Sequence, residues 1–320
     1  MNSVEDIRRM TVIGAGVMGH GIAEVYALSG YPVCIMDTKD EFLEKGMKYI
    51  EAELRTSVEN ELFTEEASQE ALSRLSTTTS MKDAVSNCEF VTEAVTEDLK
   101  LKRQIFKEME KYAPESAILA SNTSGLMITK IAQGLRHPER VVGTHFSVPP
   151  HIVPGVELIR GKKTSDSTFN IAYELIKRVD KVPFVVKKEI DGFILNRMQM
   201  ALGREAFFLV QKGIATPEDV DICLNSVLGF RWATVGPFRQ IDSAGIDTAA
   251  KVWSYLLPSL ATFKKVPKII AQKAAKGDYG MKTGKGFYEY PDIIAAYRKR
   301  DDGFLKTLKL MRDLWKGRII

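Results

Sequence analysis

Short apolar runs alternate with longer amphipathic stretches through the first 186 residues of the chain. Continuous apolar runs are typical of strands that are buried on both faces, and apolar positions three and four apart are typical of helices. The runs predict strands at residues 10–13, 32–36, 90–94, 118–121, 141–144 and 182–186. The amphipathic stretches predict helices at residues 18–29, 40–58, 98–111 and 168–179. This alternation indicates βαβ units around a mainly parallel sheet.

The pattern changes after Val186, where the strand-like runs end and helical spacing remains. We predict helices there at residues 192–212, 217–228, 248–264 and 304–315. The charged segment Lys187–Asp191, followed by Gly192, fits a hinge between two domains. The sequence therefore predicts an α/β domain at residues 1–188 and an all-helical domain at residues 189–320.

A glycine-rich segment joins the first predicted strand to the first predicted helix. Residues Val12–Gly19 read VIGAGVMG, a GxGxxG motif between a strand and a helix. Glycines in this position let backbone N–H groups and a helix N-terminus approach a pyrophosphate. We predict a Rossmann domain whose dinucleotide is held by Gly14, Gly16, Val17, Met18 and Gly19. The alternative is a glycine turn that serves only the tight packing of the helix.

Asp37 ends the second predicted strand, where a carboxylate can accept hydrogen bonds from the adenosine ribose hydroxyls. The same carboxylate repels a 2′-phosphate, so we expect NAD as the cofactor. Lys39 lies two residues further on and leaves NADP as the lesser alternative.

The distribution of charge along the chain argues against nucleic-acid binding. The 320 residues carry 45 Lys and Arg and 41 Asp and Glu, and eight of the basic and three of the acidic side chains fall in residues 298–320. The rest of the chain is close to neutral, with 37 basic and 38 acidic residues, and so lacks the excess of basic residues that binds nucleic acid.

Cysteine spacing and hydropathy bear on the compartment. Cys34, Cys88 and Cys223 are widely spaced and odd in number, so they fit neither a disulfide framework nor a zinc site. The chain has no run of about 18 apolar residues and begins without a signal-peptide pattern. We expect a cytoplasmic protein with no metal site and no membrane partner.

Four blocks after the nucleotide motif carry a resemblance to a known family. They are Ser121–Ser124 (SNTS), Gly143–Phe146 (GTHF) with Val156-Glu157, Asp191–Arg197 (DGFILNR) and Met281–Tyr288 (MKTGKGFY). In order and spacing they resemble the serine, histidine–glutamate, asparagine and closing motifs of the 3-hydroxyacyl-CoA dehydrogenase superfamily. The resemblance runs from about Met10 to Tyr288. It implies an NAD-dependent oxidoreductase, with a second domain that binds substrate and forms a homodimer.

The resemblance also implies a role for each matching residue. His145 would be the general base and Glu157 would orient it. Imidazole titrates near neutral pH, which suits proton transfer in both reaction directions. Ser124 and Asn196 would hydrogen-bond the reacting oxygen of the substrate. Further family positions near the cofactor are matched by Glu97, Lys102 and Lys282.

Each residue also has a purely structural interpretation that the sequence leaves open. His145 could be a core histidine, and Ser124 could cap a helix at residues 126–135. Asn196 could bond a neighbouring carbonyl group. Solvated positions are open to Glu157, Glu97 and Lys102.

The chain departs from the family in ways that concern the substrate. Val148 stands where the family usually has an asparagine after the histidine, and a proline-rich turn, 148–157, follows. With Leu228–Arg231, these features look more like the branch that acts on free 3-hydroxy acids and alcohols, including L-gulonate and carnitine dehydrogenases. Acidic Glu59-Asn60-Glu61 replaces lysines that meet CoA phosphates in acyl-CoA enzymes, although Lys45, Lys48 and Arg55 lie upstream.

Three functions stay open at this stage. The first is oxidation of a 3-hydroxyacyl-CoA of the 3-hydroxybutyryl-CoA type to the 3-keto form and the reverse. The second is dehydrogenation of a free 3-hydroxy acid or small alcohol. The third is a non-catalytic dinucleotide-binding structural protein, against which the complete set Ser124, His145, Glu157 and Asn196 argues.

Overall fold

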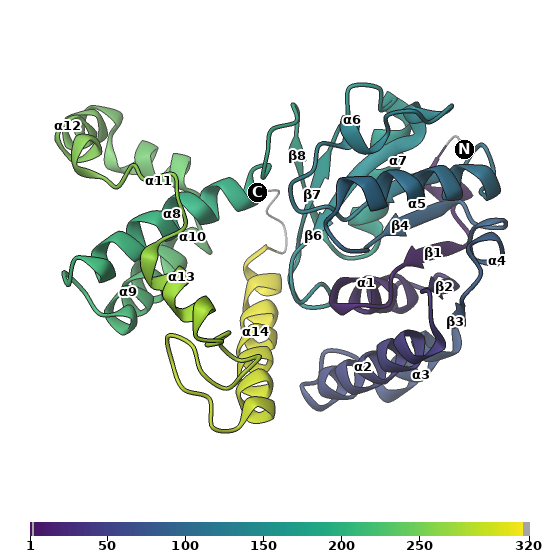
Figure 1. The fold of residues 1–320 in the computed structure, drawn as a ribbon, viewed down its shortest axis with the longest axis horizontal. Helices are drawn as coiled ribbons and strands as arrows, with labels where there is room; N and C mark the ends of the chain where they lie inside the picture. The colour runs from purple at the N-terminus through teal and green to yellow at the C-terminus, as the bar shows by residue number, and fades with distance from the viewer. Residues whose placement is uncertain (2, 316–320) are drawn as a thin grey trace. The chain divides into compact units, whose positions relative to one another are not determined.

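The structure, a computed structural model, describes residues 1 and 3–315, and the chain divides into two compact units after Asn196. The first unit combines a sheet with helices, and the described part of the second contains helices without a sheet (Figure 1). These observations agree with the expected fold class, a mainly parallel α/β domain followed by a helical domain. The sequence placed the boundary near residue 188, in the segment that leads into the first helix of the second unit.

The first unit is built on an eight-stranded sheet with the order β3-β2-β1-β4-β5-β6-β7-β8. Neighbouring strands are parallel except β6 and β7, which are antiparallel. The strands are β1 (Met10–Ile13), β2 (Val33–Met36), β3 (Leu75–Thr78), β4 (Phe90–Glu93), β5 (Ile118–Ser121), β6 (Val141–Phe146), β7 (Gly155–Ile159) and β8 (Val182–Val186). All six predicted strands are confirmed.

Two strands, β3 and β7, were missed from the sequence. The edge strand β3 reads LSTT and has only one large apolar residue. The other, β7, reads GVELI, so a buried glutamate interrupts its apolar run. Neither shows the continuous apolar pattern by which buried strands are recognised.

Helices cover both faces of the sheet. One apolar cluster packs the strands against α1 (Val17–Leu28) and α7 (Asp166–Arg178), and the other packs them against α4 (Met81–Val85), α5 (Leu99–Tyr112) and α6 (Ile128–Ile131). Outside α1 lie α2 (Asp40–Glu59) and α3 (Glu65–Ser73), and two short 3₁₀ segments are η1 (Val4–Asp6) and η2 (Pro138–Arg140). The carboxyl ends of the parallel strands β1, β4, β5 and β6 lie at one edge, where ligands bind in open α/β sheets.

The second unit begins within α8 and continues through helices joined by turns (Figure 1). Its elements are α8 (Leu195–Gln211), α9 (Pro217–Cys223), the π-helical η3 (Leu224–Gly229), α10 (Phe230–Trp232), α11 (Pro237–Ala244), α12 (Ile246–Leu256), the 3₁₀ segment η4 (Leu257–Ser259), α13 (Lys268–Ala275) and α14 (Ile293–Trp315). The helix predicted at 192–212 is confirmed from Leu195 onward, and the helix predicted at 217–228 is confirmed as α9 with η3 after it. The helix predicted at 248–264 is wrong beyond Leu256, because Pro258 cannot donate the backbone hydrogen bond of a continuing helix.

Candidate active site

The glycine motif forms the turn between β1 and α1. Gly14 has φ +102°, and a Cβ there would lie 2.9 Å from the Ala94 carbonyl oxygen. A Cβ on Gly19 would lie 1.7 Å from the Gly14 carbonyl oxygen, so only glycine fits both positions. Gly16 is the N-cap of α1, and no atom lies within 4 Å of the place of its missing Cβ. The first amides of α1 lack acceptors within the helix, so this turn fits the pyrophosphate of a dinucleotide.

Asp37 is held beside this turn by two backbone amides. Its Oδ2 accepts from Ala15 N at 2.7 Å, and its Oδ1 accepts from Thr38 N at 2.6 Å. Oδ1 also accepts from Thr38 Oγ1 at 3.3 Å, so Oδ2 is the oxygen that keeps a second lone pair for a ribose hydroxyl. Lys39 is engaged elsewhere, since its Nζ lies 3.1 Å from Glu41 Oε1. This arrangement fits NAD better than NADP.

His145 and Glu157 face each other across the antiparallel pair β6 and β7. His145 Nδ1 lies 2.6 Å from Glu157 Oε2; the histidine is 5% exposed and the glutamate fully buried. The interpretation of Glu157 as a solvated strand end is therefore wrong. Cross-strand register, which β7 provides, brings together two residues that are twelve apart in sequence.

The second oxygen of Glu157 is fixed by the start of α8. Oε1 accepts from the backbone amides of Ile194 at 2.9 Å and Leu195 at 2.8 Å. Two consecutive positive φ angles, +76° at Gly192 and +49° at Phe193, turn the chain immediately before those amides. A carboxylate at Glu157 accepts at both oxygens, which assigns Nδ1 of His145 as the donor. In that tautomer the lone pair is on His145 Nε2, which makes no hydrogen bond to any described residue.

Ser124 and Asn196 lie together at the end of β5. Asn196 Nδ2 donates to the Ser124 carbonyl oxygen at 2.7 Å, so Asn196 does bond a carbonyl, although one far away in sequence. The helix expected at 126–135 is wrong, because α6 spans only Ile128–Ile131 and its N-cap is Met127. Thr123 Oγ1 accepts from the amides of Gly125 and Leu126, which would otherwise begin such a helix. Ser124 is therefore not a helix cap.

Glu97 also binds the loop that carries Ser124. Its Oε1 accepts from Thr123 Oγ1 at 2.5 Å and from the amides of Ser124 at 3.0 Å and Gly125 at 3.1 Å. Its Oε2 lies 3.5 Å from Lys102 Nζ. Glu97 thus positions the Ser124 loop through three hydrogen bonds.

Lys102 is buried, so its interpretation as a solvated side chain is wrong. Its Nζ donates to Glu93 Oε1 at 2.6 Å, and Glu93 Oε2 accepts from Ser121 Oγ at 2.7 Å. Sequence reasoning missed Glu93; the signal was a carboxylate that ends the apolar run of β4. Together these residues join β4, α5 and β5 beneath the Ser124 loop.

The remaining expected residues lie apart from this network. Val148, 53% exposed in the turn between β6 and β7, has no polar group with which to replace an asparagine. Lys282 lies in the second unit, exposed between α13 and α14, and its contact with the cofactor stays a prediction.

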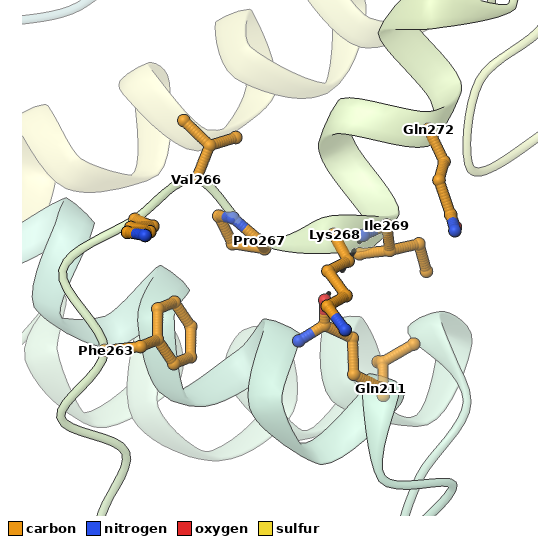
Figure 2. A pocket seen from close by; sticks show the side chains of 9 residues that line it. Gln211, Phe263, Val266, Pro267, Lys268, Ile269 and Gln272 are labelled. Carbon is orange, nitrogen blue, oxygen red and sulfur yellow. Dashed lines mark hydrogen bonds between the residues drawn. The ribbon is translucent and has the colours of Figure 1, made fainter.

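The second unit also contains a pocket, which Figure 2 shows from close by. It is lined by the end of α8 and by residues before and within α13: Val210, Gln211, Phe263, Lys265, Val266, Pro267, Lys268, Ile269 and Gln272. None of the residues expected to act in the reaction lines this pocket.

Comparison with protein families decides the affiliation of the chain. The model of the 3-hydroxyacyl-CoA dehydrogenase NAD binding domain matches residues 9–190, and the model of the C-terminal domain matches residues 192–290. The chain belongs to the 3-hydroxyacyl-CoA dehydrogenase family. It is an NAD-dependent oxidoreductase that acts on CH–OH groups, and α14 lies beyond the matched residues.

Relatives of this family member differ in their substrates. It is 35% identical to a 3-hydroxybutyryl-CoA dehydrogenase of Bradyrhizobium diazoefficiens, over 89% of this chain and 96% of the relative. It is 34% identical to a 5-formyl-3-hydroxy-2-methylpyridine 4-carboxylate 5-dehydrogenase of Mesorhizobium japonicum, over 89% of this chain and 91% of the relative. A solved structure of an enzyme of the latter activity superposes with a TM-score of 0.87 at 32% identity, over 98% of this chain and 99% of that one.

The membrane expectation can be compared with the helices of the structure. Across the described residues, none of them is both long and apolar enough to cross a bilayer. The cellular compartment stays a prediction.

Proposed function

We propose that this dehydrogenase oxidises a 3-hydroxyl to a 3-keto group with His145 as general base and Glu157 as its orienting partner. The supporting observation is the buried 2.6 Å contact between Nδ1 and Oε2, with Oε1 held by two amides. NAD bound at the glycine turn supplies the hydride acceptor. His145 Nε2 takes the hydroxyl proton, and the Glu157 carboxylate stabilises the resulting imidazolium. In the reverse direction the imidazolium returns this proton.

Ser124 and Asn196 are proposed to bind the reacting oxygen. Ser124 Oγ makes no hydrogen bond to another described residue, so the hydroxyl can donate to a substrate oxygen. Asn196 uses one N–H on the Ser124 carbonyl and keeps a second N–H for the substrate. The buried His145–Glu157 pair also argues against a purely structural dinucleotide-binding protein, which has no use for it.

The first candidate for the substrate of this enzyme is a 3-hydroxyacyl-CoA of the 3-hydroxybutyryl-CoA type. The support comes from the family and from its 3-hydroxybutyryl-CoA dehydrogenase members. Lys45, Lys48 and Arg55 on α2 are exposed, and none of them forms an ion pair with a described residue. These cations can therefore meet the phosphates of CoA.

A small free 3-hydroxy acid or alcohol, of the L-gulonate or carnitine kind, is the second candidate. Two observations favour it: the apolar Val148 and the solved structure of a pyridine-carboxylate dehydrogenase, which covers 98% of this chain. The name of that relative gives a pyridine carboxylate as its substrate.

A panel of NAD reduction rates separates the two candidates. We expect turnover of 3-hydroxybutyryl-CoA and weak turnover of free 3-hydroxy acids. If the wild-type enzyme oxidises a free 3-hydroxy acid and no acyl-CoA, the first substrate is wrong and the second stands.

We also propose a homodimer that forms through residues beyond about 190. The second unit exposes many large apolar side chains, among them Met198, Phe230 and Phe238. Such surfaces on one chain are typical of an interface between copies. Light scattering at micromolar concentration is expected to give twice the monomer mass of 35.8 kDa, and the monomer mass itself would refute the dimer.

A further inference from the structure

Three side chains of types that bind metals meet outside the proposed active site. Glu24 lies on α1, Glu53 on α2 and His151 in the turn between β6 and β7. One carboxylate or imidazole atom from each lies within 4.8 Å of the others. All three belong to the first unit, and none has a role in the reaction proposed above.

Glu24 is the least satisfied member of this cluster. It is 1% exposed, and neither carboxylate oxygen has a hydrogen-bond partner within the described residues. Its charged neighbours are Glu53, of like sign, and Lys181, of opposite sign. Because buried polar groups are nearly always satisfied in folded proteins, this carboxylate points to a ligand.

Lys181 does not satisfy Glu24, although its charge is near. Its Nζ donates to the carbonyl oxygens of His151 at 3.2 Å and Val153 at 3.1 Å. These bonds brace the turn that carries His151 and leave the Glu24 oxygens without a hydrogen bond.

The geometry of the other two members fits coordination. Glu53 Oε2 lies 3.3 Å from His151 Nδ1. Two ligands at about 2.0–2.1 Å from a tetrahedral ion are separated by about 3.3–3.4 Å, so these two atoms already have the required spacing. His20 Nε2 lies 3.1 Å from Glu53 Oε1, the carboxylate oxygen that does not face His151. Hydrogen bonds of this kind orient the carboxylates that bind metal ions.

We propose that Glu24, Glu53 and His151 bind one divalent transition-metal ion, with Zn²⁺ as the best match. Two carboxylate oxygens and one imidazole nitrogen suit Zn²⁺ better than Ca²⁺ or Mg²⁺, which prefer oxygen ligands alone. Binding forms three metal–ligand bonds and involves no change of oxidation state.

Such an ion stabilises the turn between β6 and β7. Pro150 of this turn already packs on α1, because a Cβ on Gly21 would lie 2.6 Å from Pro150 Cγ. The ion joins His151 of the same turn to α1 and α2. The expectation of no metal site rested on cysteine spacing, and no spacing pattern connects residues 24, 53 and 151.

The test uses the full-length protein after chelation and desalting. Calorimetric titration with Zn²⁺ is expected to show one ion per chain, and Zn²⁺ is expected to raise Tm. Glu24→Gln keeps the side-chain size and is expected to weaken Zn²⁺ binding at least tenfold and to abolish the rise in Tm. His151→Gln provides the same test from the turn if the first variant folds poorly.

A matched control separates this site from adventitious binding. His137 and Glu139 form an exposed pair with Nδ1 and Oε1 at 3.2 Å, and His137→Gln is expected to leave Zn²⁺ affinity unchanged. The proposal is overturned if wild type binds no Zn²⁺, if Glu24→Gln and His151→Gln bind as tightly as wild type, or if His137→Gln removes the binding. In the first case Glu24 is a protonated core carboxyl that shares its hydrogen with Glu53.

Discussion

The two units of the chain differ in how far their apolar side chains are buried. In residues 1–196 the sheet and its helices enclose two apolar clusters, with side chains such as Phe90 and Phe106 fully buried. Beyond residue 196 the buried apolar side chains of the described chain are Ala261, Leu305 and Leu308. Large apolar groups there face outward instead, with Phe238 84% exposed.

This difference in burial indicates different functions for the two units. The layered α/β unit holds His145 and Glu157 in fixed positions, because both residues lie on paired strands and their side chains are buried. The helical unit leaves apolar surface for another molecule, which we propose to be a second copy. Substitutions in the first unit should therefore affect chemistry or folding, whereas substitutions in the second should affect assembly.

The largest effect is expected from the proposed general base. His145→Gln should lower kcat by roughly 10² to 10⁴ and leave NAD affinity within a few-fold, because the imidazole acts on the hydroxyl proton and not on the dinucleotide. Steady-state kinetics and a nucleotide titration measure the two effects. Glu157→Gln should also lower the rate and shift its pH profile. A fully active His145→Gln enzyme would end this mechanism.

A pair of phenylalanines tests the packing difference directly. Phe106→Ala should lower the free energy of unfolding by about 3–5 kcal/mol, since it empties a fully buried site on α5. Phe238→Ala on α11 should change it by less than about 0.5 kcal/mol at low protein concentration. Denaturant unfolding of both variants provides the measurement. Equal losses would show that the second unit packs as tightly as the first.

The features that sequence predicted well depend on local pattern. Buried parallel strands such as β1 are mostly apolar in sequence, and the turn from Gly14 to Gly19 needs glycine at defined positions for steric reasons. Asp37 follows directly from the end of β2. These features could be predicted because neighbours in the sequence determine them.

The features that local pattern missed depend on contacts between distant segments. The role of Glu157 came only from the family resemblance, because its environment is made by β6 and the start of α8, which no local pattern of β7 reveals. Glu93 likewise becomes part of the site only through Lys102 and Ser121. A buried carboxylate is polar in the sequence, so hydrophobic periodicity assigns it to the surface.

A smaller effect is expected in cofactor choice, which belongs to the first unit alone. NAD should bind at least about tenfold more tightly than NADP, or roughly 1.4 kcal/mol, because Asp37 occupies the place of a 2′-phosphate. Calorimetric titration with both nucleotides measures the ratio. Lys39→Ala should leave this ratio unchanged, since the ammonium lies against Glu41. Equal or reversed affinities in wild type would assign the choice to Lys39.

The smallest effect is expected in the KM for an acyl-CoA substrate. The test compares the substitution of one lysine from each unit. If CoA is bound, Lys48 on α2 meets a phosphate, and Lys48→Glu should raise KM for acetoacetyl-CoA several-fold with little change in kcat. Turnover of any free 3-hydroxy acid should stay the same. Lys299→Glu on α14 makes the same change of charge at an exposed position in the second unit and should leave KM unaltered.

The control decides what a rise in KM means. Equal increases in the two variants would indicate a general effect of net charge on an anionic substrate, which acts over long range and weakens with salt. An increase in Lys48→Glu alone indicates a contact on α2. No increase in either variant, with acyl-CoA turned over by wild type, would remove Lys48 from the binding site and leave Lys45 and Arg55 as the cations on α2 to test.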